Sequence, residues 1–231
     1  IKVFDELKAK GHKPMGIRID SGDLQYLSVE AKKLFEEAGY TDLTYTASND
    51  LDEYTIASLK SSGAAINSWG VGTKLITSAE SPSLGGVYKL AGSYNGDTLI
   101  PKIKVSEEPE KINNPGFKKV VRIYNEDNMA EADLIMLHDE KIDTTKPLTI
   151  FDPTYTWKQT TFHNYTIKEL QKPLFINGEC KYVSKSVNEV KKYVSEQFST
   201  LWDSYKRFSN PKKYKVDLSD NLWTLKSDLL D

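Results

Sequence analysis

The sequence predicts an α/β protein in which a region of alternating strands and helices precedes a β-rich region. Three apolar runs, at 15–20, 43–48 and 64–69, each end in small and polar residues, and helical patterns separate them. After the glycine pair at 85–86, short apolar runs are instead separated by Gly, Pro, Asn and Asp turns. Strands that alternate with helices form parallel sheets, whereas short strands joined by turns favour antiparallel ones. We therefore expect one unit over residues 1–86 and a β-rich and helical unit over 87–231.

Apolar residues at helical spacing predict three helices in the first unit, at 1–9, 24–39 and 52–62. In the strand at 15–20, Arg18 is the one charge before the final Asp20, which suits a parallel strand buried on both faces. The strand ends at 20, 48 and about 70 are spaced by one βα unit each. Three strands cannot close an eight-stranded barrel, so this region would form only part of one.

The second unit is expected to begin with short strands. Apolar runs bounded by turn residues predict strands at 87–91, 102–105, 120–124 and 134–137, and the pattern at 160–177 is ambiguous. One long helix is expected at 187–205, where apolar residues recur on one side. The tail at 210–231 is too apolar for a disordered end and is expected to pack onto this unit.

Composition excludes several classes of protein. The 231 residues carry a formal charge of −2, from 31 basic and 33 acidic residues, so no overall field attracts the chain to nucleic acid or membranes. No apolar run approaches the roughly 20 residues that span a bilayer. The single cysteine, Cys180, excludes an internal disulfide framework and a multi-cysteine zinc site, and it fits a cytoplasmic location.

The amino terminus begins directly in a helical pattern. Residues 1–8 place Val3, Phe4 and Leu7 on one face, with no initiating Met and no capping residue before them. We therefore expect the chain to be the carboxyl-terminal part of a longer protein.

The most informative residues follow the three strands of the first unit. They are 20–23 (D-S-G-D), 48–50 (S-N-D) and 70–73 (G-V-G-T). The carboxyl ends of parallel strands share one edge of the sheet, and ligands bind there. This edge is expected to bind a phosphorylated ligand that is rich in hydroxyl groups.

Each strand end carries groups suited to such a ligand. Gly70 and Gly72 would let the backbone approach a phosphate, and the Thr73 hydroxyl adds a donor, although an ordinary tight turn explains the glycines equally well. Because Arg18 and Asp20 are two residues apart on a strand, they point to the same side. Either they serve a site or they form a pair that bridges strands.

Further polar residues at this edge admit two interpretations. Carboxylates that could help to hold Mg²⁺ beside a pyrophosphate occur at Asp23, Asp50, Asp52 and Glu53. The last two also suit the first turn of a helix, where acidic residues complement the helix dipole. Asn49 could bind ribose hydroxyls or act as a turn or N-cap residue.

Several long motifs resemble the nicotinate phosphoribosyltransferase family, in the form typical of Gram-positive bacteria. They are G-I-R-I-D-S-G-D-L at 16–24, A-S-N-D-L-D-E at 47–53, W-G-V-G-T-K-L-I-T at 69–77 and S-L-G-G-V-Y-K-L at 83–90, followed by the stretches at 101–116, 132–140 and 150–158. The resemblance covers nearly the whole chain in order, and it is far more specific than a single glycine-rich turn.

The resemblance implies a fold and a reaction. The fold would be part of an irregular TIM-like α/β barrel of the type II phosphoribosyltransferases, beside a β-rich domain, in a homodimer with its sites at the subunit interface. The enzyme, of the ATP-dependent ligase class, would join nicotinate to 5-phosphoribosyl-1-pyrophosphate in NAD biosynthesis, with ATP as co-substrate and Mg²⁺ as cofactor. The products would be nicotinate mononucleotide, pyrophosphate, ADP and phosphate.

The same resemblance implies residue roles. Residues at the centre of the site, near the base and ribose, would be Arg18 and Asp20, with Ser21 beside them. The ribose and phosphate would lie against Ser48 and Asn49, and the 5′-phosphate would be bound by Gly70, Gly72 and Thr73. The reaction passes through an oxocarbenium-like state, so positioning and charge stabilisation matter more than a protein nucleophile.

Part of the family pattern is absent from these residues. The family's phosphorylated histidine and the residues that bind the nicotinate ring precede the matched motifs, and none of His12, His138 and His163 lies in the histidine motif. The chain therefore resembles the carboxyl-terminal half of the enzyme, and we expect it to be inactive by itself.

Three alternatives remain open from the sequence. The first is a phosphoribosyltransferase of the same fold that acts on nicotinamide. The second is a barrel hydrolase or aldolase that uses Asp20 and Asp23 as acid and base. The third is a non-catalytic interaction module built on residues 87–231.

Overall fold

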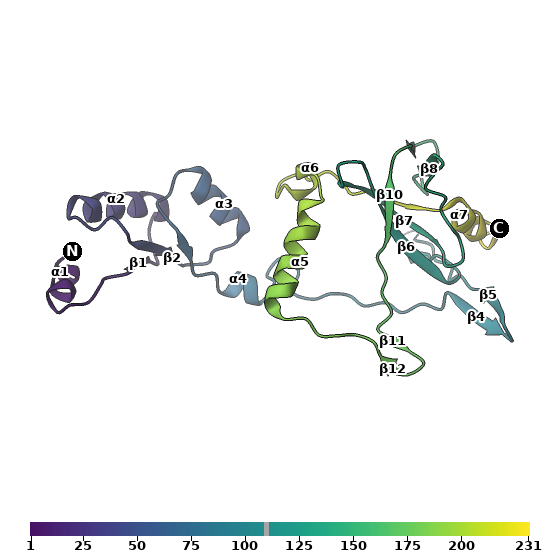
Figure 1. The fold of residues 1–231 in the computed structure, drawn as a ribbon, viewed down its shortest axis with the longest axis horizontal. Coiled ribbons are helices and arrows are strands. Elements are labelled where there is room, and N and C mark those ends of the chain that lie inside the picture. Colours follow the sequence, from purple (N-terminus) through teal and green to yellow (C-terminus); the bar gives the residue numbers. More distant parts are fainter. Residues whose placement is uncertain (109–110) are drawn as a thin grey trace. The chain divides into compact units, whose positions relative to one another are not determined.

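The computed structural model describes every residue except 109–110, and it divides into two compact units, Ile1–Gly86 and Val87–Asp231. The two undescribed residues fall within the motif at 101–116, so that part of the motif lies outside the described residues. Figure 1 shows the elements of both units, and each unit is described by itself below. Among the described residues, no helix is long and apolar enough to cross a membrane.

The first unit alternates helices and strands, as the sequence predicts. Its elements are α1 (Lys2–Ala9), β1 (Gly16–Ile19), α2 (Leu24–Glu37), β2 (Thr44–Ala47), α3 (Glu53–Ser61), β3 (Ser68–Trp69) and α4 (Thr73–Ile76). The three strands form one parallel sheet in the order β1-β2-β3. The α/β class is therefore confirmed. The described strands of this unit form an open sheet and do not show a closed barrel.

One face of this sheet carries the core of the unit. Ile17 of β1 packs against the cluster that contains Phe35 of α2, and Ile19 packs against the cluster that contains Leu24 and Leu51. Alternate residues of a strand point to opposite faces, so Arg18 lies on the other face, where it is exposed. The prediction that this strand is buried on both faces is therefore wrong for the described chain, because α2 and α3 contribute to the core on one face only.

The second unit is built on a six-stranded sheet. Its elements are β4 (Gly92–Asn95), β5 (Thr98–Pro101), β6 (Lys118–Tyr124), β7 (Ala130–Leu137), β8 (Leu148–Phe151), β9 (Gln159–Phe162), β10 (Thr166–Glu169), β11 (Phe175–Ile176), β12 (Glu179–Cys180), α5 (Val187–Ser199), α6 (Asp203–Lys206), β13 (Val216–Leu218) and α7 (Asp220–Asp228). The strand order of the large sheet is β10-β6-β7-β13-β8-β9. Its pairs are antiparallel except that β13 lies parallel to β7. The remaining strands form the hairpins β4-β5 and β11-β12.

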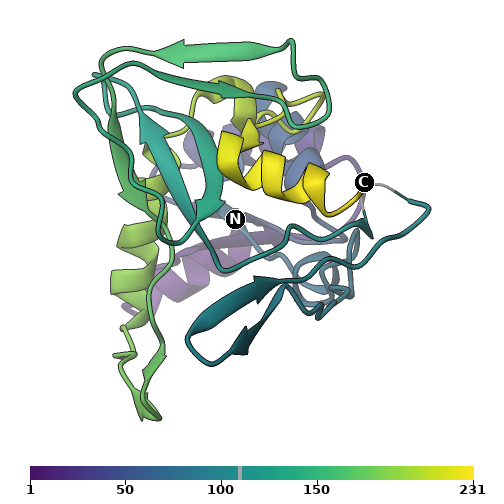
Figure 2. The same cartoon turned by 90° about the vertical axis from the view of Figure 1, so that its right-hand side faces the viewer.

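The tail at 210–231 completes this sheet, which confirms that it packs onto the unit. Strand β13 inserts between β7 and β8, and α7 follows it and contacts β7. Figure 2 shows α7, in yellow, beside these strands. Leu222 of α7 has no exposed surface, and Ile123 and Ile150 of the sheet are also buried.

Two predicted strands and one predicted helix differ from the structure. The strands expected at 87–91 and 102–105 flank the true hairpin, whose turn at Gly96 and Asp97 places the pairing at 92–101 instead. The helix expected at 187–205 breaks after Ser199. At the break, the carbonyl of Thr200 accepts a hydrogen bond from the backbone N–H of Ala130, at 2.8 Å, which ties the chain to β7.

Candidate functional site

The carboxyl ends of β1 and β2 bring together a guanidinium, a hydroxyl and a carboxylate. Arg18 Nη1 donates a hydrogen bond to Ser48 Oγ at 3.1 Å, and Ser48 Oγ donates to Asp20 Oδ1 at 2.5 Å. Arg18 Nη1 also lies 3.3 Å from Asp20 Oδ1. Parallel pairing of the two strands, with Arg18 opposite Thr46, places these groups side by side although 28 to 30 residues separate Ser48 from the other two.

This group faces solvent. The side chains of Arg18 and Asp20 are 63% and 55% exposed. An exposed ion pair stabilises a fold by only about 0–1 kcal/mol, so folding by itself gives little reason for the arrangement. Because the pair and its bridging hydroxyl are accessible, they can bind an anionic and hydroxyl-bearing ligand.

The remaining residues after β1 turn the chain into α2. Ser21 follows Asp20 and is exposed, and Gly22 adopts a φ of 79°, which a residue with a Cβ rarely does. Asp23 accepts a hydrogen bond from the backbone N–H of Tyr26 at 3.0 Å and so caps α2. The Asp23 carboxylate is therefore engaged in capping, which weakens the hydrolase or aldolase alternative that needs it as an acid or base.

Asp52 has the same capping role in α3. Its side chain accepts a hydrogen bond from the backbone N–H of Thr55 at 2.8 Å, and this bond holds the pKa of Asp52 below its ordinary value. Glu53 lies in the first turn of the same helix, where an acidic residue suits the dipole. Both positions therefore have a structural explanation.

The turn after β2 has an unusual backbone. Asn49 and Asp50 have φ angles of 97° and 43°, in the left-handed region that side chains other than glycine seldom adopt. Both side chains are exposed, while the next residue, Leu51, is 1% exposed and anchors the turn in the core. Consecutive residues in rare conformations often mark functional sites, and here they border Ser48.

The glycine turn after β3 lies against the end of β2. The backbone N–H of Gly70 donates to the carbonyl of Ala47 at 2.8 Å, and a Cβ at Gly70 would lie 3.4 Å from the Cβ of Ser48. Gly72 precedes α4, no side chain caps this helix, and a Cβ at Gly72 would meet no atom within 4 Å. Thr73 is exposed at the start of α4. The turn therefore presents uncovered backbone beside Ser48.

The structure does not gather the acidic residues of this edge into a metal site. Within the described part of the chain, no group of three or more His, Cys, Asp or Glu side chains could hold a metal ion. With Asp23 and Asp52 engaged as helix caps, Asp20 and Asp50 are the exposed carboxylates nearest the strand ends.

Sequence reasoning did not find the hydrogen bonds through which Ser48 joins Arg18 to Asp20. The signal that could have found them is the register of the two strands, because the residue after β2 lies level with the residue after β1. It also missed a cavity of about 920 Å³ in the second unit, lined by lysines and tyrosines from segments between 131 and 217.

Comparisons with known proteins agree with the predicted resemblance. Residues 117–226 match the family model described as the nicotinate phosphoribosyltransferase C-terminal domain. The chain is 45% identical over 213 residues to the nicotinate phosphoribosyltransferase of Bacillus subtilis, which covers 92% of this chain and 44% of that protein. It is 36% identical over 223 residues to the Caenorhabditis elegans protein of the same name, covering 92% of this chain and 39% of the relative.

A solved structure shares the fold. The crystal structure of human nicotinic acid phosphoribosyltransferase matches with a TM-score of 0.73 and 24% identity, covering 96% of this chain and 41% of that one. The chain thus spans less than half the length of these relatives. Over nearly all of its length, the chain is similar to part of the nicotinate phosphoribosyltransferases, and residues 117–226 match the model of that family's carboxyl-terminal domain.

Proposed function

We propose that this chain supplies part of the ribose-phosphate site of a nicotinate phosphoribosyltransferase. The observation that carries the proposal is the exposed group of Arg18, Ser48 and Asp20 at adjacent strand ends. The enzyme would join nicotinate to 5-phosphoribosyl-1-pyrophosphate, with ATP as co-substrate, and form nicotinate mononucleotide in NAD biosynthesis. It would belong to the ATP-dependent ligase class and work in the cytoplasm.

Each residue of the site has a part in this proposal. The guanidinium of Arg18 attracts the charged substrate, and Asp20 and Ser21 lie where a ribose or base would be positioned. Ser48 and Asn49 supply hydroxyl and amide groups for the ribose and phosphate. The 5′-phosphate would lie on the turn at 70–73, where Gly70 and Gly72 leave the backbone uncovered and Thr73 adds a hydroxyl.

A Mg²⁺ cofactor fits the chemistry of this edge. Magnesium bound with phosphates usually keeps several waters and takes only one or two protein carboxylates. Asp20 and Asp50 are exposed next to the proposed phosphate site, so either carboxylate could meet that need. When bound, the ion would neutralise charge that develops on the departing pyrophosphate.

We also propose that the complete site forms in a homodimer, at the subunit interface, and that the 231-residue chain is inactive alone. The resemblance places the base-binding residues and the phosphorylated histidine outside the motifs matched here. This chain would then bind phosphoribosyl pyrophosphate without converting it. Its relatives are named for nicotinate, which favours that base over nicotinamide.

The test combines a binding assay with an activity assay. Calorimetry with phosphoribosyl pyrophosphate and Mg²⁺ should detect binding, and Arg18→Ala should weaken it by about tenfold to a hundredfold, since hydrogen bonds to charged groups are worth about 1.5–3 kcal/mol. Arg207→Ala, which removes an exposed arginine of the second unit, is the matched control.

Product formation should be absent with nicotinate or nicotinamide in the isolated chain. The Bacillus subtilis relative serves as the positive control for the same assay. Nicotinate mononucleotide made by the isolated chain would overturn the proposed inactivity. Equal binding by the wild type and Arg18→Ala would overturn the proposed site.

A further inference from the structure

One cavity of the second unit is rich in lysine. It measures about 920 Å³ and lies between the segment that joins β8 to β9 and the segment at 205–217. Four of its fifteen lining residues are lysines, and three are tyrosines. Cavities of roughly 300–1,000 Å³ accommodate small-molecule ligands, so this one has the capacity for a ligand of nucleotide size.

The carboxylates of the cavity are already engaged by the protein. Asp217 is 2% exposed, and its Oδ2 forms an ion pair with Lys215 Nζ at 3.2 Å. The same oxygen accepts no hydrogen bond from the described residues. Asp152 accepts hydrogen bonds from two backbone N–H groups, each at 2.9 Å. Glu131 accepts one from the Asn125 amide at 2.8 Å.

Within the described residues, no carboxylate forms an ion pair with Lys158, Lys212 or Lys213. All three residues are exposed and line the cavity, so they lie at its rim. Backbone N–H groups, chiefly that of Tyr155, lower the pKa of Asp152, and the charges of Lys158 and Lys215 lower it further. The four lysines of the lining outnumber its three carboxylates, so the cavity has a small net positive charge.

Hydrogen bonds fix the backbone beneath two of these lysines. The N–H of Lys158 donates to the carbonyl of Tyr155 at 2.8 Å, and the N–H of Lys212 donates to the carbonyl of Ser204, also at 2.8 Å. Their ammonium groups lie over aromatic rings: Lys158 Nζ is 4.2 Å from the ring centre of Tyr155, and Lys212 Nζ is 5.4 Å from that of Tyr205. These contacts already restrict the two lysine side chains, so a ligand that orders them would cost less conformational entropy.

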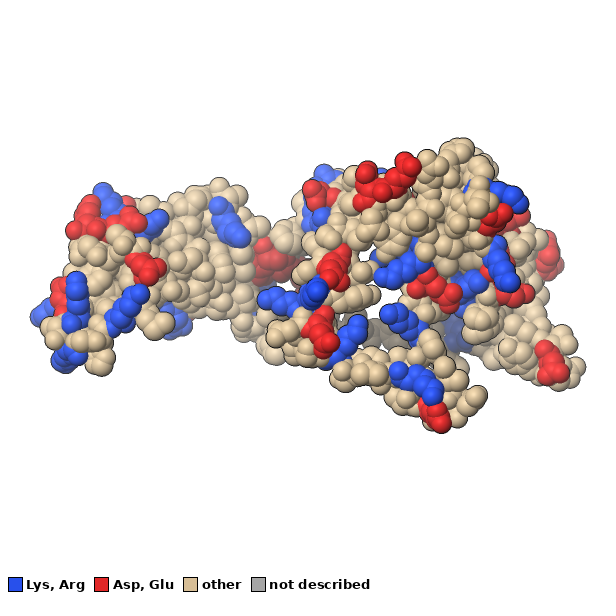
Figure 3. Space-filling model, in the orientation of Figure 1, with Lys and Arg blue, Asp and Glu red and all other residues tan. Residues whose placement is uncertain are grey.

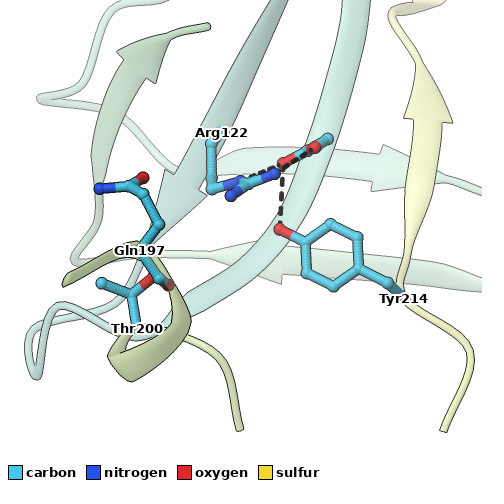
Figure 4. A network of polar contacts seen from close by, with 5 residues as sticks. Arg122, Gln197, Thr200 and Tyr214 are labelled. Atoms are coloured by element: carbon cyan, nitrogen blue, oxygen red, sulfur yellow. Dashed lines mark hydrogen bonds and ion pairs between the residues drawn. The ribbon is translucent and has the colours of Figure 1, made fainter. Parts of the chain in front are cut away.

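The wall beside them is also held in place. Tyr214 donates its hydroxyl to Asp133 Oδ1 at 3.0 Å, and Arg122 binds both oxygens of the same carboxylate, at 2.7 and 2.9 Å. Figure 4 shows Arg122 and Tyr214 converging on this carboxylate. The hydrogen bond to Asp133 holds Tyr214 in place, and Tyr214 directly follows Lys212 and Lys213 in the chain. The position of this segment is therefore restricted.

We propose that this cavity binds a diphosphate or triphosphate group, as free pyrophosphate or as part of a nucleotide. Four lysines line this concave surface, three of them outside the ion pairs of the described residues, and lysine is a common phosphate ligand. The tyrosines at the wall offer apolar surface that a nucleotide base could cover. The site is additional to the strand-end site, which the proposed function assigns to residues 18–73.

Calorimetry on the full 231-residue chain at low salt tests this, with three probes that separate the sources. Pyrophosphate tests the phosphate group alone, ADP tests the nucleotide, and adenosine tests the base without phosphate. We expect pyrophosphate, ADP or both to bind, and adenosine to bind at least tenfold more weakly. Binding by pyrophosphate favours the free ion, and binding by ADP alone favours a nucleotide. Equal binding by adenosine, or no binding by either phosphate probe, would overturn the proposal.

Paired variants locate the site. The double variant Lys212→Ala/Lys213→Ala should weaken binding at least tenfold, whereas Lys191→Ala/Lys192→Ala, an adjacent exposed pair in α5, should leave it unchanged. Binding should persist in Arg18→Ala. If Arg18→Ala abolishes binding and the 212/213 variant does not, the phosphate binds at the strand ends, and the cavity proposal fails while the proposed function stands. Phosphate binding that survives in Arg18→Ala but not in the 212/213 variant supports the cavity whether or not the proposed function holds.

Discussion

Ser48 joins the two charged groups of the candidate site. Its single hydroxyl accepts from Arg18 and donates to Asp20, so it helps to orient both side chains, which also form a direct ion pair at 3.3 Å. Neither side chain is buried, and no packing replaces these bonds. Ser48 is therefore a positioning residue as well as a candidate ligand of the ribose and phosphate.

Removing this hydroxyl should weaken substrate binding without unfolding the protein. We expect Ser48→Ala to lower the affinity for phosphoribosyl pyrophosphate by about tenfold, since a hydrogen bond contributes about 0.5–1.5 kcal/mol and two are lost. Calorimetry measures the affinity, and a thermal melt should show little change. Ser48→Thr keeps the hydroxyl and should recover most of the affinity. If Ser48→Ala binds as tightly as the wild type, the positioning role is excluded.

Asp133 has a comparable role in the second unit, where it is structural. Its side chain is 12% exposed and accepts hydrogen bonds from Arg122 and Tyr214. The hydrogen bond to Asp133 raises the pKa of Arg122, and burial raises the pKa of Tyr214, so Arg122 stays charged and Tyr214 stays neutral. The Asp133 carboxylate thus accepts hydrogen bonds from both partners at once.

Neutralising that carboxylate should destabilise the unit. Asp133→Asn replaces an oxygen that accepts from Arg122 with an amide that cannot, and we expect a loss of about 2 kcal/mol in the free energy of unfolding. Urea unfolding measures this free energy for the wild type and the variant. Asp97→Asn, at the exposed hairpin turn, is the control and should change stability by less than about 0.5 kcal/mol. A similar, small effect of both variants would contradict this account.

At the scale of elements, α7 closes the core of the second unit. Its Leu222 is fully buried, and the N-cap Ser219 accepts a hydrogen bond from the Leu222 N–H at 3.2 Å. The preceding strand, β13, pairs with β7 and β8 at once. The helix therefore holds strands together that are distant from it in the sequence.

Truncating the Leu222 side chain should destabilise the second unit, because it leaves a cavity in the core. We expect Leu222→Ala to lower the free energy of unfolding by about 3 kcal/mol, within the range for buried leucine. Leu84→Ala is the matched control, because Leu84 is 93% exposed and its truncation opens no cavity. Urea unfolding, followed by circular dichroism, compares the two. Equal losses would show that α7 is not part of the cooperative core.

Across the whole molecule, basic and acidic residues are nearly equal in number, at 31 and 33. Figure 3 shows basic and acidic side chains interspersed on one face. Hydrogen bonds rather than long-range charge hold several pKa values below the ordinary 3.8 of Asp and 4.5 of Glu: for Asp52 and Asp152 the largest cause is a backbone N–H, and for Asp143 and Glu189 it is a side-chain donor. These groups occur in both units.

Their lowered pKa values predict the direction of the pH dependence. A carboxyl group with a lowered pKa in the folded state stabilises the fold above its unfolded pKa, and this contribution is lost as the pH falls through the folded pKa. We expect the melting temperature to be constant between about pH 7 and pH 5 and to fall below about pH 4. Asp52→Asn keeps the cap without titrating and should reduce the fall. A melting temperature that rises on acidification would contradict this assignment.

The sequence by itself determined the three longer helices and the strands of the first unit, and it supplied the candidate site residues, but it did not predict α4. Helical periodicity located α2 and α3, and the polar residues after each short strand located the strand ends. These signals are local, because the side-chain period of a helix or strand is set by its own backbone. The family motifs are local for the same reason, since they are runs of consecutive residues.

Only the tertiary structure decided which residues meet. Ser48 reaches Arg18 and Asp20 through the parallel register of β1 and β2, and β13 enters the sheet between strands that precede it by many residues. The same holds for the lysines of the cavity, which come from separate segments. A sequence pattern specifies which face of an element is apolar, but the partner of that face depends on packing between distant segments. For this reason the candidate residues were evident in the sequence, whereas their hydrogen bonds and the second cavity were not.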